Sequence, residues 1–153
     1  MPRIDDRLEE LGLTLPDPVA PVANYVPYVI SGNLVFISGQ VSIGADGLIK
    51  GTLGAGMDIA EGVAAAKACG VNLIAQLRSA CGGDLDRVKH VVKLGGFVNS
   101  TPEFTDQPKV INGASDLMVE VFGEVGRHAR AAVSAPSLPL GAAVEVDGVF
   151  EIA

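Results

Sequence analysis

The sequence predicts an α+β sandwich in which two helices cover one face of a mixed sheet of about four to six strands. Two segments repeat apolar residues at helical spacing, and five others alternate or run apolar as strands do. These segments follow the order β-β-α-β-α-β-β along 153 residues, a length that suits one domain. We therefore expect a single domain over 1–153, with an N-terminal arm at 1–24 and a core at 25–153.

The N-terminal segment predicts a short helix followed by an extended arm. Residues 4–11 suit one or two helical turns, which Gly12 closes. Pro16-Asp17-Pro18 and Pro21 keep the next segment extended, because proline fixes φ and lacks a backbone donor.

A hairpin and a long loop are expected next. Apolar segments at 28–30 and 34–38 flank Ser31-Gly32-Asn33, which suits a tight turn between two strands. Gly39-Gln40 ends the second strand, and six Gly lie between positions 39 and 56. The run 51–56 is rich in glycine but carries no Lys, so it does not predict a phosphate-binding loop.

Two helices are predicted, with a long strand at 88–98 between them. The first spans 57–80, with Asp58 and Glu61 in its first turn. Its apolar stripe consists of Val63, Gly70, Val71, Ile74, Leu77 and Cys81. The second helix is expected to begin at the cap residue Asn112. Its inner face consists of Leu117, Met118, Val121, Phe122 and Val125.

The last two strands are expected at 129–135 and 142–152, paired as a hairpin through 136–141. Their alternation places one apolar set inward, against the helices: Ala131, Val133, Ala135, Val144, Val146 and Val149. The opposite set faces away from the helices and is more polar: His128, Arg130, Ala132, Ala143, Glu145 and Asp147.

On this pairing, Arg130 lies across from Glu145 or Asp147, depending on the register. One interpretation is a surface ion pair between strands, which contributes only about a few tenths of a kcal/mol. The other is a cleft in which Arg130 grips a substrate carboxylate while Glu145 handles a proton or a water. The small Ala132 beside Arg130 leaves space for a small ligand.

The composition favours self-association and excludes several classes of protein. Charged residues (11 Lys and Arg, 18 Asp and Glu) make up 19% of the chain, where about 25% is usual, and hydrophobic residues make up 48%. Copies of the chain are therefore expected to cover part of its surface. The net charge of −7 argues against nucleic-acid binding, and no apolar run is long enough to span a bilayer.

Both cysteines are predicted to be buried thiols. On one helix, the twelve residues from Cys69 to Cys81 would separate them by about 18 Å, too far for a disulfide. Thiols persist in a reducing compartment and the first seven residues carry no apolar signal segment, so a cytoplasmic location is expected. With two His and neither Cys-x-x-Cys nor His-Glu-x-x-His, no metal site is predicted.

Three motif sets are spaced over nearly the whole chain, from about Leu8 to Ile152. They are Gly32-Asn33-Leu34 with Ser38-Gly39-Gln40; Val110-Ile111-Asn112-Gly113-Ala114-Ser115; and Arg130-Ala131-Ala132-Val133 followed by Leu138-Pro139 and Val144-Glu145-Val146. Together they resemble the Rid family of imine/enamine deaminases, the YjgF group once called L-PSP endoribonucleases. The chain is most similar to the longer YjgF/chorismate-mutase-like subfamily.

The resemblance implies a chorismate-mutase-like fold and a homotrimer with clefts at its subunit interfaces. In the deaminase members, the residue matching Arg130 binds the carboxylate of a 2-imino or 2-enamine acid, and the backbone N–H at the position of Ala132 assists. The residue matching Glu145 places the hydrolytic water. Further positions that match the lining of this cleft are Tyr25, Ser38, Gly39, Asn112 and, less closely, Phe97. No metal or organic cofactor is implied.

The sequence leaves three functions open. The resemblance favours deamination of a small carboxylate-bearing imine or enamine; the alternatives are a non-catalytic trimeric binder of such a metabolite, and an endoribonuclease or translation inhibitor. The acidic net charge disfavours the last. Ala132 stands where short members often have Cys, and the loop 39–56 is longer than theirs. His128, two residues before Arg130, is either an added acid/base group at the rim or a structural polar residue.

Overall fold

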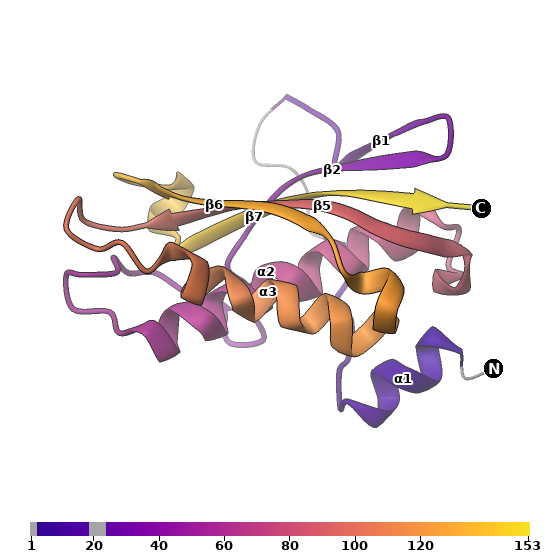
Figure 1. Cartoon of the computed structure of the whole chain (residues 1–153), viewed down its shortest axis with the longest axis horizontal. Coiled ribbons are helices and arrows are strands. Elements are labelled where there is room, and N and C mark those ends of the chain that lie inside the picture. The colour runs from indigo at the N-terminus through magenta and orange to yellow at the C-terminus, as the bar shows by residue number, and fades with distance from the viewer. Residues whose placement is uncertain (1–2, 19–23) are drawn as a thin grey trace.

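The structure confirms the α+β class and the predicted order of the main elements (Figure 1). It is a computed structural model that describes residues 3–18 and 24–153. Its helices are α1 (Ile4–Glu10), α2 (Ile59–Ala80) and α3 (Gln107–Phe122). The main sheet consists of β1 (Tyr28–Ser31), β2 (Leu34–Val41), β5 (Val88–Asn99), β6 (Ala129–Ala135) and β7 (Val144–Ile152). A separate small hairpin, β3 (Ile43–Gly44) with β4 (Gly47–Leu48), forms inside the loop after β2 and was not predicted.

The five strands of the sheet follow the order β1-β2-β7-β5-β6. β1 and β2 form the predicted hairpin, but the predicted hairpin of the last two strands is wrong, because β5 lies between β6 and β7. β5 pairs in parallel with β6 and antiparallel with β7. The link from β6 to β7 contains the turn η3 (Pro139–Gly141), in which Leu140 has a φ of 64°. This link is longer than the loop of a tight hairpin, which has about two to five residues, because it crosses β5 on its way to β7.

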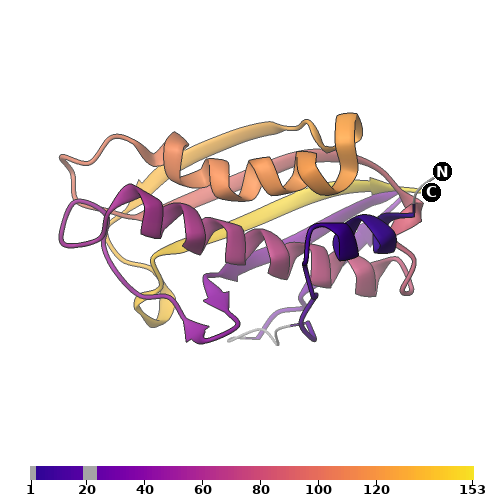
Figure 2. The same cartoon turned by 90° about the horizontal axis from the view of Figure 1, so that it is seen from below.

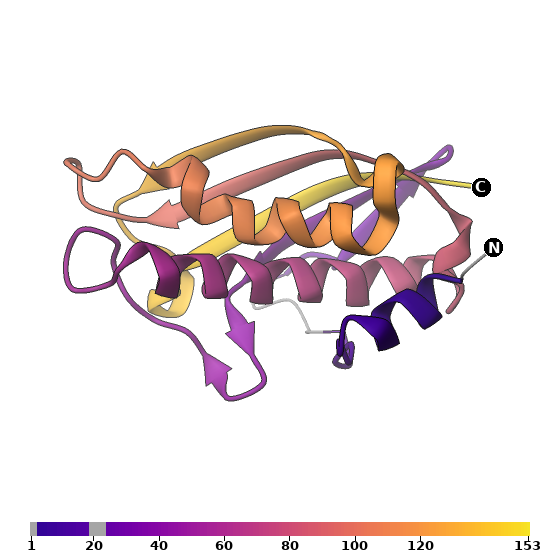
Figure 3. The same cartoon turned by 60° about the horizontal axis from the view of Figure 1, so that its bottom comes forward.

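Helices α2 and α3 lie side by side on one face of the sheet, as predicted, and none of the described helices lies on the opposite face (Figure 2, Figure 3). The two helices approach closely at Gly113, where an added Cβ would lie 3.0 Å from the carbonyl carbon of Val63 and 3.1 Å from the nitrogen of Lys67. The largest side chains fully buried between the layers include Phe150, Leu73, Ile74, Leu77, Leu94, Ile111, Leu117 and Met118.

The start of α2 is as expected and the start of α3 is not. Asp58 caps α2, and its carboxylate accepts from the backbone of Glu61 at 2.8 Å while Glu61 accepts from the backbone of Asp58 at 3.1 Å. α3 begins five residues before the predicted cap Asn112, because Pro108 suits the first turn of a helix. Val125, predicted on the inner face of α3, lies in the following turn and is 39% exposed.

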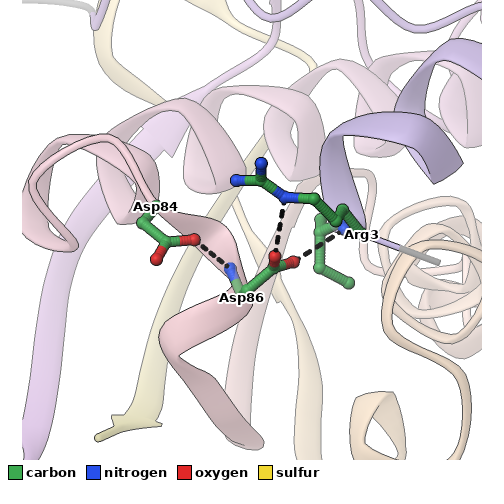
Figure 4. Close-up of polar contacts among 4 residues, drawn as sticks. Arg3, Asp84 and Asp86 are labelled. Carbon is green, nitrogen blue, oxygen red and sulfur yellow. Dashed lines mark hydrogen bonds and ion pairs between the residues drawn. The ribbon is translucent and has the colours of Figure 1, made fainter. Parts of the chain in front are cut away.

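The carboxylate of Asp86, in the turn η1 (Leu85–Arg87), forms hydrogen bonds to the start of helix α1. Asp86 accepts from Arg3 Nε at 3.0 Å and from the backbone nitrogen of Ile4 at 2.8 Å (Figure 4). The backbone hydrogen bond is the largest of the causes that lower the pKa of Asp86. The expected short N-terminal helix is confirmed, whereas Pro21 of the expected arm lies outside the described residues.

Both thiols are buried and free, as predicted. Burial is the main cause that raises the pKa of Cys69 and of Cys81, so neither is a ready thiolate. Within residues 3–18 and 24–153, no helix is long and apolar enough to cross a membrane.

Candidate active site

Arg130 lies on the edge strand β6 with its guanidinium over α3. Nη1 donates to Asn112 Oδ1 at 2.8 Å and to Ser115 Oγ at 3.2 Å, and Nη2 donates to the carbonyl oxygen of Pro108 at 3.4 Å. These acceptors from one helix hold the guanidinium in a single orientation. Among the residues that the structure describes, Arg130 Nε has no acceptor, so part of the donor fork is available to an anion.

This orientation corrects the predicted alternation of β6. Arg130 reaches α3 and Ala132 packs against the core, so both face the helices. Ala131 and Val133 face the open side, where Val133 is 47% exposed. The two alternating sets of this strand both contain small apolar residues, so hydrophobicity did not distinguish them. The hydrogen bonds to α3 select the face.

Glu145 lies on the central strand β7 and on the open face of the sheet, as predicted. Its backbone pairs with Val41 of β2 and with Phe97 of β5. Gly39 leaves space for its carboxylate, because a Cβ there would collide with Glu145 Oε2. Burial raises the pKa of Glu145, and the negative charge of Asp147 raises it further. The carboxyl therefore keeps its proton to a higher pH than an exposed glutamate does.

A second carboxylate, Asp147, lies on the same face beside a second glycine. A Cβ at Gly95 would collide with Asp147 Oδ1. Burial raises the pKa of Asp147, against the opposing effects of a hydrogen bond from Gly95 and the charge of Lys93. A hollow of about 320 Å³ lies here between β2, β5, β6 and β7, and Phe97 lines it. Val149 also lines this hollow, so its side chain lies on the open face of the sheet and not on the helix side, contrary to prediction.

Ser38 forms a hydrogen bond to Val26, the residue after Tyr25. Its hydroxyl donates to the carbonyl oxygen of Val26 at 2.8 Å, while Tyr25 itself is 46% exposed. Ser38 and Gly39 lie where the pairing of β2 with β7 shifts by one residue. Such bulges re-aim side chains and are frequent next to active sites.

Within one chain, the predicted site residues form two groups on opposite sides of the sheet. The group on the helix side consists of Arg130, Asn112 and Ala132. The group on the open side consists of Glu145, Gly39 and Phe97, with Ser38 beside Gly39 at the bulge; Tyr25 is exposed and precedes Val26, the residue that Ser38 contacts. The expectation that Arg130 lies across from Glu145 or Asp147 is therefore wrong: β5 separates the two strands, and the side chains point to opposite faces.

Sequence reasoning missed Ser115 as a member of the helix-side group. It follows Asn112 by three residues on α3, so the two side chains project to the same side of the helix. That spacing, visible in the motif, was the available signal. His128 joins the same cluster, with Nε2 2.9 Å from Ser115 Oγ. In the described part of the chain, no three His, Cys, Asp or Glu side chains gather where they could hold a metal ion.

The family described as "YjgF/chorismate_mutase-like, putative endoribonuclease" matches residues 5–151, a range that includes every predicted site residue. The chain belongs to this family. The resemblance inferred from the motifs is thereby confirmed, together with the chorismate-mutase-like fold of the YjgF family.

Three relatives illustrate the range of similarity within the YjgF family. Protein TCP17 of Trypanosoma cruzi is 53% identical over 152 residues, which cover 98% of this chain and 94% of that protein. The structure of a "putative endoribonuclease" from Shewanella oneidensis is 39% identical with a TM-score of 0.94, covering 99% of this chain and 100% of that one. RidA from the Antarctic bacterium Psychrobacter is 28% identical with a TM-score of 0.60, covering 91% and 96%.

Proposed function

We propose that this YjgF-family chain hydrolyses small 2-imino and 2-enamine acids to 2-keto acids and ammonia without a cofactor. The observation that carries the proposal is the guanidinium of Arg130, which acceptors on α3 orient while Nε stays available. A guanidinium held in this way suits a planar carboxylate better than a mobile cation does. The similarity to RidA agrees with the resemblance to the Rid deaminases.

Arg130 and Glu145 can act on one substrate only if they come from two copies of the chain, since they lie on opposite sides of one sheet. The open face also exposes apolar side chains that another copy would cover: Val29 (52%), Phe36 (44%) and Val133 (47%). We therefore infer a homotrimer, as the resemblance implies, in which the open face of one copy borders Arg130 of the next. A mass near three times 15.7 kDa in solution is expected.

The proposed reaction needs few groups. A 2-enamine acid tautomerises to its imine, whose C=N carbon is attacked by water; the C–N bond then breaks and ammonia leaves. Arg130 binds the carboxylate and fixes the position of the imine carbon. Glu145 takes a proton from the attacking water and returns one to the departing nitrogen. A raised pKa suits a carboxyl that must both accept and donate a proton.

The test generates 2-imino acids in situ with an amino-acid oxidase and follows the appearance of the keto acid with and without the protein. Acceleration is expected, and Glu145→Gln is expected to lower kcat by about 10²- to 10⁴-fold while ligand binding persists. Arg130→Ala is expected to raise KM strongly. Glu151→Gln is the matched control, because Glu151 lies on the same strand and receives a hydrogen bond from Asn33, remote from Arg130 and Gly39.

The outcomes separate the alternatives. Carboxylate binding that depends on Arg130, without turnover for any side-chain class, would replace deamination by a carrier function. Acceleration that survives Arg130→Ala would mean that the site lies elsewhere. RNA cleavage that depends on Glu145 would favour the endoribonuclease alternative, which a net charge of −7 disfavours.

A further inference from the structure

A serine and a histidine form a hydrogen-bonded pair beside Arg130, and in the proposed deamination the serine only helps to orient Arg130. Ser115 projects from α3, and His128 lies just before β6. The hydroxyl Oγ of Ser115 is 2.9 Å from His128 Nε2. The other ring nitrogen, Nδ1, is 2.6 Å from the carbonyl oxygen of Gly126. The pair therefore has the form of a nucleophile, a base and a third group that orients the base.

The direction of each hydrogen bond follows from what its partners can do. The carbonyl of Gly126 only accepts, so Nδ1 of His128 carries a hydrogen and donates it. In the neutral ring, Nε2 is then an acceptor. Arg130 only donates, and it donates to Ser115 Oγ at 3.2 Å, so the hydroxyl hydrogen of Ser115 is left for Nε2. The hydroxyl of Ser115 therefore donates its hydrogen bond to His128 Nε2 and accepts one from Arg130.

The pair is accessible and lies in a small, charged cleft. Ser115 and His128 are both partly exposed. They line a cleft of about 260 Å³ with Arg127 and Arg130, against the single carboxylate of Asp116. The volume is below the about 300–1,000 Å³ of pockets for drug-sized ligands, so the cleft suits an acyl group of a few atoms. The guanidinium of Arg130 favours the negative charge that develops when a carbonyl is attacked, whereas Arg127 Nε is paired with Glu124 at 3.3 Å.

We propose that Ser115 is an acyl-accepting nucleophile with His128 as its base, acting on activated esters of short carboxylic acids. Ser115 Oγ bonds to the carbonyl carbon while its proton passes to His128 Nε2. The bond from that carbon to the leaving oxygen then breaks, and Nε2 gives its proton to the leaving oxygen. Water repeats the sequence on the acyl-serine and releases the acid. The step needs no oxidant, metal or cofactor, and it does not rest on the proposed deamination.

p-Nitrophenyl acetate is the probe that tests this assignment on the full chain. A burst of nitrophenolate is expected, and peptide mass spectrometry of the acid-quenched protein is expected to find the acetyl group on Ser115. Ser115→Ala and His128→Gln are each expected to slow acetylation by about 10²-fold or more. Alanine suits the interior of α3, so the first variant is expected to fold. Ser134→Ala is the matched control, since Ser134 pairs with the hydroxyl of Ser100 at 2.7 Å and has no imidazole beside it.

Three results would overturn the proposal. The first is acetyl found only on other residues of the wild-type protein, a result that depends on no variant. The second is a Ser115→Ala burst equal to that of the wild type. The third is ester hydrolysis that Ser115→Ala retains and His128→Gln loses, because the imidazole of His128 would then be the nucleophile.

Discussion

Replacing Gly39 with alanine tests whether the position of the Glu145 carboxylate matters, without removing the carboxylate. Gly39 does not have a positive φ, so alanine can adopt its backbone conformation without strain. The new Cβ would nevertheless collide with Glu145 Oε2 and would lie 2.9 Å from Cδ and 3.1 Å from Cγ. The substitution therefore displaces one carboxyl group while the backbone of β2 keeps its path.

The size of the displacement sets the expected effect. Ordinary van der Waals contact begins at 3.4 Å, so Cδ must retreat from 2.9 Å and Oε2 must retreat further. Misplacement of a reacting group by about 1 Å costs about 10²-fold in rate, and we expect kcat for imine hydrolysis to fall by about 10- to 100-fold. This corresponds to about 1.4–2.7 kcal/mol of activation free energy. KM should change little, because Arg130 is untouched.

The assay is keto-acid formation from an imine generated in situ, with kcat and KM measured separately. Gly44→Ala is the matched control, because an added Cβ there meets its nearest atom at 3.6 Å, an ordinary contact. Equal melting temperatures and equal oligomer mass for the two variants would exclude a folding effect. A Gly39→Ala protein that turns over at the wild-type rate would refute the role given to Glu145.

Three further substitutions test the helix contact, the buried carboxyl and the held guanidinium. Gly113→Ala drives a Cβ into a backbone carbonyl of α2 and is expected to lower stability by about 1–3 kcal/mol, measured by urea unfolding; an unchanged midpoint would contradict the tight contact. Because burial and Asp147 raise the pKa of Glu145, the ionised carboxyl costs stability above that pKa, and the cost disappears as the pH falls through it. The Glu145→Gln variant should therefore have a higher melting temperature than the wild type at pH 8, and this difference should shrink as the pH is lowered toward the ordinary pKa of glutamate. A difference that stays constant with pH would oppose this reasoning. Asn112→Ala removes the 2.8 Å bond to Arg130, worth about 1 kcal/mol at an exposed site, so KM for the imine should rise about fivefold, and an unchanged KM would count against the orienting role.

Elements that depend on neighbouring residues were predictable from the sequence. The carboxylate of Asp58 with Glu61 three residues later predicted the first turn of α2, and the capping box is present. The turn at Gly32, with a φ of 62°, joins the predicted hairpin. Glycines 82 and 83, both with positive φ, follow the end of α2 as expected.

Elements that depend on residues distant in the sequence were not predictable. The alternation of β6 carries no information on which strand pairs with it, so the partner β5 appeared only in the structure. The same limit applies to Arg130, whose face is selected by acceptors on α3, 15 to 22 residues earlier in the chain. Asn112 looked like a cap because a cap and a hydrogen-bond acceptor for arginine use the same side chain. In the structure Asn112 lies inside α3 and accepts from Arg130, a contact that the local sequence pattern could not show.

The place of β7 in the sheet orders the folding of the chain during synthesis. β7 is the last strand in sequence but is central in space, with β2 on one side and β5 on the other. Leu34 pairs with Glu151, so the partner strand of the β1–β2 hairpin is synthesised more than a hundred residues after it. Without β7, neither β2 nor β5 has a strand that pairs it with the other, so each is expected to leave an unpaired edge until residues 144–152 have left the ribosome. Nascent chains of this protein should therefore depend on protection from aggregation until that strand is inserted.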